Sequence, residues 1–370
     1  MAKYALATIL FADLLNPDEL VKKLSLEEYD DMIVDFQNTM SLVASNHLRD
    51  FGYVGIGMDS EWSVVGDELR VYLYSGDLRF DIRNALQLAV KLKLGWLASA
   101  FNQGILMEGR PVSRLSIGIN CEEVTQDTTQ KQIRAKRGQH PIDKFPIHLT
   151  KQIEAIAREG KVYQVMVEEK VFQFCSMDDR INVAFGQPLH GVLKGKEKNK
   201  AVYEVISFIN YEIVSTMPDL FQDRLQETME YAIAHSVPEP WIFFTLLRHY
   251  ISKIRGGDSD ELAPKAVMLA DQALGFLEHK KTIYNILGWL YTNCEKIRDL
   301  EMALHYFNKT LDVAPNDEAA LIHRGRISEE KGNIELARRS YERILGRKPD
   351  HPEAVKKLAR YDGMYPDPEV

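Results

Sequence analysis

The sequence predicts an α+β domain over residues 1–210 and an all-α helical solenoid over residues 241–370. Two observations support this prediction. Strand-like and helix-like segments alternate through the first part of the chain, with a β-hairpin signal at residues 61–75. In the second part, helix-length segments with short turns repeat small, aromatic and proline residues at a fixed spacing. Residues 218–236 have helical periodicity, which Pro238 and Pro240 then break, so we expect a helical connector over residues 211–240.

The composition is that of a globular protein with more than one domain. The chain has 370 residues, of which 27% are charged and 45% hydrophobic, enough for two or three buried cores. Its formal net charge of −8 argues against a general nucleic-acid-binding protein, because phosphate contacts require a basic surface. The basic run KQIRAKRG at residues 131–138 is too short to reverse this, and we expect it to be a solvated loop.

Cysteine usage and the lengths of the apolar runs predict a cytoplasmic protein. The three cysteines lie too far apart for a zinc knuckle or a CxxC redox pair, and an odd number leaves one unpaired, which favours a reducing compartment. The apolar N-terminal run is broken by Asp13, so it is predicted to be a strand rather than a signal peptide. No stretch of the sequence approaches the roughly 18 apolar residues of a membrane span.

The first elements of the α+β domain follow from their apolar patterns. Residues 4–11 are aliphatic and β-branched, as in a central strand that is buried on both faces. Residues 26–51 carry apolar side chains at helical spacing and predict a long amphipathic helix. In the hairpin, the residues on either side of Gly66-Asp67 alternate, which places an acid at the tip of the turn. Taken alone, a Gly-Asp pair between strands is most often an ordinary turn.

The later elements complete a β-α-β-β-α-β core. We expect, in order, a helix at 80–101, a strand at 112–124, an irregular stretch at 141–146, a helix at 147–158 closed by Gly160, a strand at 161–167, and two strands around a charged turn at 191–208. This order predicts a sheet with antiparallel strands and helices on one side, an α+β sandwich of the ferredoxin-like type.

Five short phrases in this segment resemble, in the same order, the class III adenylate/guanylate cyclase homology domain. They are LFADL at 10–14, LSLEE at 24–28, the Gly66-Asp67 hairpin tip, LSIGINCEEV at 115–124 and VLKGKEKNKAVYEV at 192–205. The resemblance covers about residues 4–207 and implies a ferredoxin-like cyclase domain. Since active sites in that family form between two such domains, it also implies a homodimer or a heterodimer.

The resemblance implies a site for Mg²⁺ or Mn²⁺. In such enzymes, two metal ions bind the triphosphate, activate the 3′-hydroxyl and stabilise charge at the transferring phosphorus. Their carboxylate ligands correspond to Asp13 and Asp67, although an acid at a strand end can also be a simple cap. The positions expected to contact the nucleotide are Phe11, Leu14, Gly66 and Lys151.

Several positions depart from the family pattern and predict a degenerate site in which no catalytic residue is assigned. The lysine that selects the purine, before the hairpin turn, becomes Ser63. A second base-contacting position falls near Pro141, which offers no side-chain hydrogen bond. The nucleotide preference of the family is therefore not encoded at either position.

The family helix VNxAARLE aligns with IHLTKQIE, so its asparagine becomes His148 and its phosphate-stabilising arginine becomes Gln152. Because Gln152 carries no positive charge, the transition state would lose a group commonly worth orders of magnitude in rate. Lys151 could restore the charge only through a register shift, since one position along a helix turns a side chain by about 100°. His148 is either a replacement polar contact or merely a solvated side chain.

The second half resembles a tetratricopeptide (TPR) array. Its shared positions recur after 34 residues: Ala303, Phe307 and Pro315 become Ala337, Tyr341 and Pro349. Gly288 and Gly325 occupy the small-residue position of the preceding helices. A more divergent helix pair is predicted at 241–280, and a capping helix at 352–361. The resemblance implies a protein or peptide ligand on the concave face; a purely structural or dimerising array is the alternative.

The favoured hypothesis is a catalytically impaired cyclase homologue that acts as a regulator or scaffold, with or without residual metal or nucleotide binding. Its TPR array would bind protein, and we expect no nucleic-acid partner. One alternative is an active nucleotidyl cyclase, a phosphorus-oxygen lyase, working as a homodimer or with a partner subunit that supplies the missing groups. The other alternative is a cyclase fold that serves only as a dimerisation body for the repeats.

Overall fold

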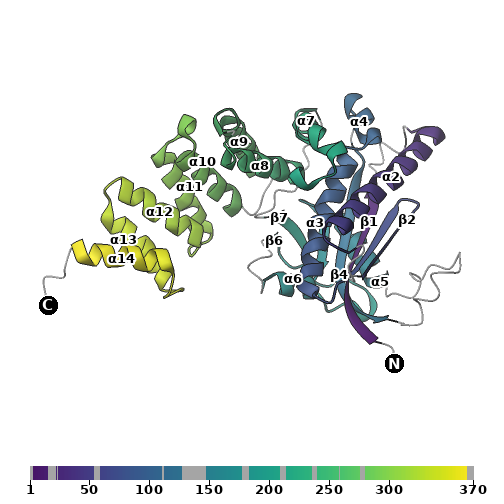
Figure 1. The fold of residues 1–370 in the computed structure, drawn as a ribbon, viewed down its shortest axis with the longest axis horizontal. Helices are drawn as coiled ribbons and strands as arrows, with labels where there is room; N and C mark the ends of the chain where they lie inside the picture. The colour runs from purple at the N-terminus through teal and green to yellow at the C-terminus, as the bar shows by residue number, and fades with distance from the viewer. Residues whose placement is uncertain are drawn as a thin grey trace. The chain divides into compact units, whose positions relative to one another are not determined.

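The computed structural model describes residues 3–15, 22, 24–53, 59–110, 112–126, 147–176, 183–208, 214–235, 240–257, 259–275 and 280–364. The chain divides into two compact units, Met1–Leu246 and Leu247–Val370 (Figure 1). The predicted basic loop at 131–138 and the irregular stretch at 141–146, with Pro141, lie outside the described residues.

A seven-stranded sheet forms the centre of the first unit, in the order β2-β3-β1-β4-β5-β7-β6. The strands are β1 (Lys3–Leu15), β2 (Asp59–Val65), β3 (Glu68–Tyr74), β4 (Arg114–Gln126), β5 (Val165–Glu168), β6 (Val183–Phe185) and β7 (Val202–Phe208). β4 and β5 are parallel, and the other neighbouring strands pair antiparallel. β1 is central and buried, because β3 and β4 pair with its two edges.

Helices cover both faces of this sheet. The helices of the first unit are α2 (Leu26–Asp50), α3 (Leu78–Leu97), α4 (Ala100–Met107), α5 (Ile147–Ala157), α6 (Glu169–Ser176) and α7 (Asp219–His235). α3 packs on β1 and β4 and is in turn contacted by α2 and α6 (Figure 1). α5 packs on β1, β4 and β5 from the opposite face. The prediction of helices on one side only was therefore wrong.

Gly118 explains the position of α5. Residues that lie opposite each other in antiparallel strands have side chains on the same face, so Gly118 faces the same way as Phe11. A Cβ atom at Gly118 would lie 2.5 Å from the backbone nitrogen of Glu154 and 2.7 Å from the backbone oxygen of Thr150. The glycine of LSIGIN therefore allows the helix backbone to lie directly on the strand.

The structure confirms the first strand, the long helix and the hairpin. The phrase LSLEE is the start of α2, where Ser25 and Glu28 form a capping box: the Glu28 N–H donates to the Ser25 hydroxyl, and the Ser25 N–H donates to the Glu28 carboxylate. The helix predicted at 80–101 is instead two helices, because Ser99 caps a new helix, α4. Asn102 fixes this break by bonding the carbonyl oxygens of Trp96 and Ser113.

The prediction of two strands at 191–208 was wrong in part. β7 is present and pairs with β5 and β6, but Gly195–Glu197 forms a 3₁₀ turn (η3), and only an isolated bridge joins Leu189 to Val202. The strand at 161–167 begins later than predicted, at Val165. The preceding backbone N–H groups are bound instead by the Glu204 carboxylate. α6 was not predicted, since its eight residues are too few for a clear periodic signal.

The second unit consists of consecutive helix pairs. α8 (Pro240–Arg255) crosses the division between the units and is followed by α9 (Ser259–Leu274), α10 (Lys281–Asn293), α11 (Leu300–Val313), α12 (Glu318–Glu330), α13 (Ile334–Leu345) and α14 (Pro352–Met364). α10 packs on α11 and α12 packs on α13, and each pair contacts the next helix along the chain.

The same glycine-to-aromatic contact occurs in two successive pairs. A Cβ atom on Gly288 would lie 2.8 Å from the ring of Phe307, and one on Gly325 would lie 2.7 Å from the ring of Tyr341. Both rings are fully buried. Because Gly288 on α10 and Gly325 on α12 have no side chain, the aromatic rings of α11 and α13 can pack against the backbone of these helices. The spacing of these residues in the sequence predicts this packing.

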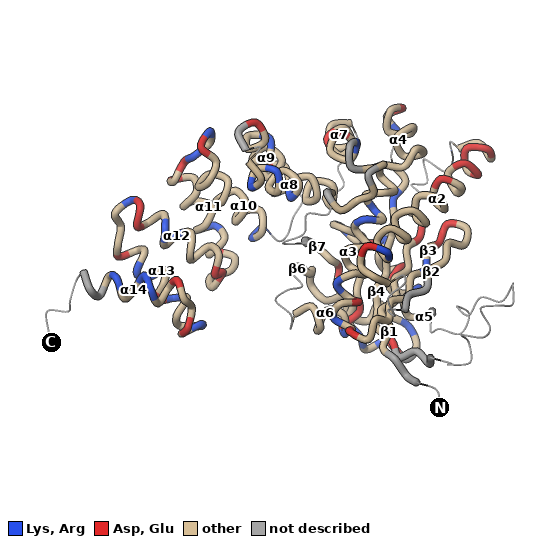
Figure 2. Tube along the Cα trace, viewed as in Figure 1, with Lys and Arg blue, Asp and Glu red and all other residues tan. Residues whose placement is uncertain are grey.

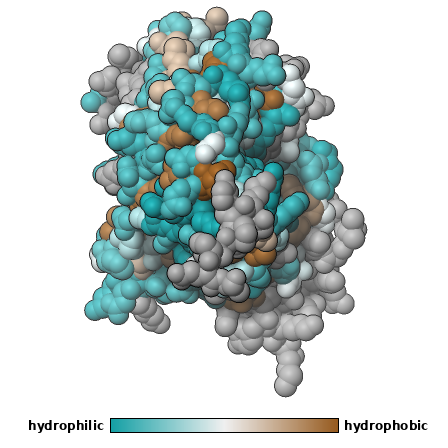
Figure 3. Space-filling view, turned by 90° about the vertical axis from the view of Figure 1, so that its left-hand side faces the viewer, coloured by the Kyte–Doolittle hydropathy of each residue, from teal (hydrophilic) through white to brown (hydrophobic). Residues whose placement is uncertain are grey.

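The molecular face on the side of α12–α14 is mainly hydrophilic, with hydrophobic residues in separate patches (Figure 3). Among the helices in the described part of the chain, none is long and apolar enough to cross a membrane.

Candidate functional site

Asp13 lies near the end of β1 on the face of the sheet that α5 covers. Its partners across the sheet are Glu68 on β3 and Ser116 on β4. Because side chains alternate along a strand, Asp13 and Phe11 share this face, whereas Leu14 points to the other face and is buried in the core. The Leu14 side chain therefore does not face the Asp13 cluster.

The Asp13 carboxylate forms an ion pair with an arginine that was not predicted from the sequence. Arg158, the first residue after α5, places Nη2 2.5 Å from Asp13 Oδ2 and Nε 3.2 Å from Glu154 Oε1. Glu154 also accepts a hydrogen bond from Ser116 Oγ at 2.5 Å. Arg158, Asp13, Glu154 and Ser116 thus form one connected polar cluster, in which a single guanidinium group is shared by two carboxylates.

The environment of Asp13 disfavours its charge. Burial raises its pKa from 3.8 to about 6, with further increases from Glu154 and then Asp67, while Arg158 lowers it and Glu68 raises it slightly. The single arginine only partly offsets burial and the neighbouring acids. At neutral pH the cluster therefore retains an excess of negative charge around Asp13.

Asp67 lies beside Asp13 at the tip of the hairpin. The Leu14 N–H donates to the Asp67 carbonyl oxygen at 3.2 Å, which fastens the turn to the end of β1. Gly66 has φ of +62°, so its position in the sequence is explained by the turn. Its carbonyl oxygen accepts a hydrogen bond from Gln37 Nε2 at 3.2 Å. The structure thus places Asp13 and Asp67, the two predicted metal-binding acids, near each other. The charge of Asp67 raises the pKa of Asp13.

Two cations lie over the ring of Phe11. The Arg70 guanidinium is 5.4 Å and the Lys151 ammonium 5.8 Å from the ring centroid. Both cations also pair with Glu68, at 2.8 Å and 3.1 Å respectively. Ser63, the position expected to select the base, lies opposite Arg70. The positive charge of this hairpin is therefore on Arg70, where Glu68 neutralises it.

Lys151 and Gln152 point to different places, as the helical turn between them requires. Lys151 extends to Glu68, whereas the Gln152 side-chain oxygen accepts the Lys194 N–H at 2.7 Å. Gln152 and His148 line a separate cavity of about 570 Å³ with the following residues: Cys121, Glu122, Leu149, Lys170, Lys194, Gly195, Glu197 and Lys200. The Lys151 ammonium group thus lies in different surroundings from the Gln152 side chain.

The donor set around Asp13 does not fit a divalent metal ion. In the part of the chain that the structure describes, no group of three or more His, Cys, Asp or Glu side chains is arranged to hold one. One Asp13 oxygen is engaged by Arg158, a cation that repels a second cation. Sequence reasoning missed Arg158 because no motif contains it; the only available signal was the four-residue spacing from Glu154, which is common on helix surfaces.

Comparisons with known proteins give weak similarities. No protein-family model and no curated protein matches the sequence. Similar solved structures include the guanylyl cyclase Cya2, with 18% identity, 56% of this chain and 95% of that chain covered, and a TM-score of 0.41. They also include the adenylyl cyclase CyaB from P. aeruginosa, with 16% identity, 56% and 96% coverage, and a TM-score of 0.41. A bacterial light-regulated adenylyl cyclase has 15% identity, 61% and 58% coverage, and a TM-score of 0.36. These TM-scores are too low to assign the chain to a family.

Proposed function

We propose that the first unit is a catalytically impaired homologue of the class III nucleotide cyclases, and that the protein acts as a regulator or scaffold. The observation that carries this proposal is the ion pair between Arg158 and Asp13. A cyclase of this type needs an open carboxylate at this position to bind a metal ion. Here the chain supplies its own cation to that carboxylate.

The polar groups outside this cluster, on β3 and α5, support the same conclusion. Arg70 and Lys151 are both engaged by Glu68 and are not free to meet a triphosphate. Gln152 is uncharged, and it is already bonded to the backbone of Lys194. Each group that would have to stabilise charge in a phosphoryl-transfer transition state is thus missing or has an internal partner.

Residual anion binding is a second candidate function, and one observation favours it. The cavity beside His148 and Gln152 is lined by Lys170, Lys194 and Lys200. Lys200 is paired with Glu197 at 2.6 Å, and Lys170 and Lys194 outnumber the one other carboxylate of the lining, that of Glu122. A nucleotide or another phosphate compound would be the ligand, bound without turnover.

We further propose that the second unit is a TPR array that binds a protein or peptide on its concave face. The repeated packing of Gly288 on Phe307 and of Gly325 on Tyr341 supports this assignment, because a shared contact in successive helix pairs is what a repeat requires. Dimerisation through the first unit would present two such arrays. If the first unit serves only this purpose, nucleotides will have no effect on it.

The test is turnover by the full chain with Mn²⁺ or Mg²⁺ and each of the four nucleoside triphosphates, followed by chromatography for cyclic products. We expect no cyclic nucleotide. Reproducible product that Asp67→Ala abolishes would overturn the proposal and favour a working cyclase. Calorimetry with a non-hydrolysable triphosphate then separates the remaining functions: binding that Lys194→Ala weakens supports the anion site, and no heat supports the dimerisation body.

A further inference from the structure

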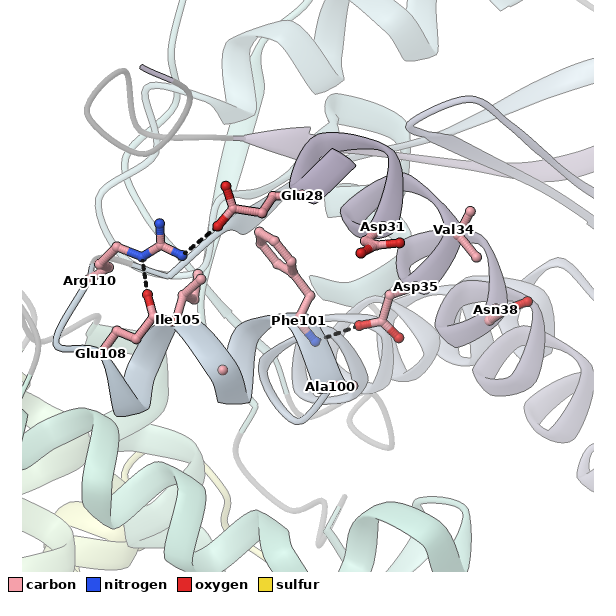
Figure 4. A pocket seen from close by; sticks show the side chains of 11 residues that line it. Glu28, Asp31, Val34, Asp35, Asn38, Ala100, Phe101, Ile105, Glu108 and Arg110 are labelled. Carbon is pink, nitrogen blue, oxygen red and sulfur yellow. Dashed lines mark hydrogen bonds and ion pairs between the residues drawn. The ribbon is translucent and has the colours of Figure 1, made fainter. Parts of the chain in front are cut away.

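A groove of about 420 Å³ runs between α2 and α4 (Figure 4). It shares no lining residue with the Asp13 cluster, because α2 packs on α3, whereas α5 carries Glu154 of that cluster. Each helix contributes residues at helical spacing, so a continuous face of each lines the groove. The lining residues are Glu28, Asp31, Val34, Asp35 and Asn38 of α2, Ala100, Phe101, Gly104 and Ile105 of α4, and Glu108 and Arg110 after it.

The two walls are held together by specific bonds. The Asp35 carboxylate accepts the Phe101 N–H at 2.8 Å, which anchors the start of α4 to the middle of α2 (Figure 4). Beyond the end of α4, Arg110 pairs with Glu108 at 2.8 Å and with Glu28 at 3.7 Å. The groove is therefore fixed at both ends before any partner arrives, so little conformational entropy would be lost on binding.

The lining of the groove includes exposed apolar surface. Val34 is 56% exposed on α2, while Ile105 is buried beneath Gly104 on α4. Nothing lies within 4 Å of the position that a Gly104 Cβ would take, so the backbone of α4 is open to the groove. Leu26 at 87% and Met107 at 79% are also highly exposed on these helices, although they do not line the groove. Exposed apolar side chains that line a groove are typical of a docking surface.

The rim of the groove is acidic. Four carboxylates, from Glu28, Asp31, Asp35 and Glu108, face one guanidinium, from Arg110. Acidic residues continue along the first half of α2 outside the groove (Figure 2). Among the described residues, no hydrogen bond or ion pair holds the Asp31 carboxylate, which is exposed and accessible to a ligand. A nucleic acid or an anionic membrane would be repelled by these acids, and so would the same acidic groove of a second copy of this chain.

We infer that this groove binds a basic amphipathic segment of another protein. Aliphatic side chains of the segment would contact Val34 and Phe101, and its lysine or arginine side chains would pair with Asp31 and the neighbouring rim acids. This is the helix-in-groove mode of peptide recognition, with the specificity set by charge. The inference does not depend on whether the Asp13 cluster is catalytic.

The probe is a fluorescein-labelled synthetic helix of leucine and lysine with the leucines on one face, titrated with the full chain and followed by fluorescence anisotropy. Asp31→Lys should weaken its binding about fivefold or more, since one attraction is replaced by a repulsion. Asp30→Lys is the matched control: it makes the same charge change on the same helix, at a residue that does not line the groove. Val34→Asp should weaken binding comparably, whereas Val313→Asp, at a valine that is 57% exposed on α11, should not.

Circular dichroism establishes that the four variants, all at exposed positions, remain folded. Weakening by Asp31→Lys and Val34→Asp, with both controls within twofold of the unaltered chain, supports the inference. Equal weakening by the controls would overturn it, as would equal binding of a peptide with the same composition in scrambled order. Displacement of the probe by spermidine at matching concentrations would identify a small cation as the ligand. Self-association in sedimentation velocity that Asp31→Lys abolishes would identify a second copy of the chain as the ligand of the groove. The displacement by spermidine and this self-association would each overturn the inference.

Discussion

Replacing Asp13 with asparagine should stabilise the first unit at neutral pH, although Asp13 lies at the centre of the candidate site. Its pKa in the folded chain is about 6, against an ordinary value of 3.8 for an aspartate in water. A native state that binds a proton more tightly than the unfolded state loses stability as the pH rises between these two values. The ionised carboxylate therefore destabilises the fold above pH 6, and asparagine, which resembles the protonated acid in shape, removes the cost.

The size of the effect follows from the shift in pKa. At about 1.4 kcal/mol for each pKa unit, the difference between 3.8 and about 6 corresponds to an upper value of about 3 kcal/mol. This shift already includes the attraction of Arg158, which lowers the pKa of Asp13, so the gain is reduced only to the extent that an amide fits the site less well than a protonated carboxyl group. We expect Asp13→Asn to raise the free energy of unfolding of the first unit by roughly 1–3 kcal/mol at pH 7.

Urea denaturation of both proteins from pH 4 to pH 8 measures this directly. The other titrating groups contribute equally to the stability of both proteins, so their contributions cancel in the difference between Asp13→Asn and the unaltered chain. One of these groups is His47, for which burial lowers the pKa to about 3. The gain should be present at pH 7 and disappear as the pH falls from 6 toward 4. Asp31→Asn, at an exposed carboxylate, is the control and should change stability by less than about 0.5 kcal/mol at any pH. A loss of stability in Asp13→Asn at pH 7, or a gain independent of pH, would refute the reasoning.

Substitutions at Gly118, Gly325 and Ser25, two of them with a matched control, test the packing and the helix cap. Gly118→Ala should destabilise the first unit by about 1–3 kcal/mol in urea denaturation, because its Cβ would meet the α5 backbone at 2.5 Å; Gly104→Ala, in an open helical position, should be neutral or stabilising. Gly325→Ala should lower the stability of the second unit by a similar amount through the Tyr341 ring, and an unchanged thermal transition would contradict the packing of α12 on α13. Ser25→Ala should cost about 1 kcal/mol by removing the N-cap of α2, whereas Ser25→Asp should retain most of the stability.

The fold of the first unit was predictable wherever a local pattern determines an element. Alternation around Gly66-Asp67 predicted the hairpin, and helical spacing predicted α2 from its capping box onward. The break at Ser99 was not predictable, since the apolar residues continue through it and the cause is a set of bonds from Asn102 to distant carbonyl oxygens. The segment before β7 was predicted wrongly because its two apolar residues, Val192 and Leu193, are adjacent and determine no clear pattern; it forms a 3₁₀ turn, preceded by a single bridge from Leu189 to Val202.

Of the residues in the candidate site, only the two acids Asp13 and Asp67 could be predicted from the sequence to lie together. The resemblance to the cyclase phrases placed Asp13 and Asp67 together, and they are neighbours in the structure. Arg158 could not be predicted because its partner is 145 residues away in the sequence and belongs to another element. Glu68 and Arg70 share one face of β3, as alternation along any strand would place them, and only the folded sheet shows that they are mostly buried and neutralise each other beside Phe11. Whether a carboxylate is open or occupied depends on tertiary contacts, which no local motif records.

Binding of Mn²⁺, followed by the loss of its free-ion electron paramagnetic resonance signal, tests the central claim most directly. The account predicts that the unaltered chain shows no Mn²⁺ binding that Asp13→Asn removes. It also predicts that Arg158→Gln gains such binding, because the acids around Asp13 then lack their internal cation. Site-specific binding of Mn²⁺ by the unaltered chain, lost in Asp13→Asn and unaffected by Arg158→Gln, would contradict the account and restore a working metal centre.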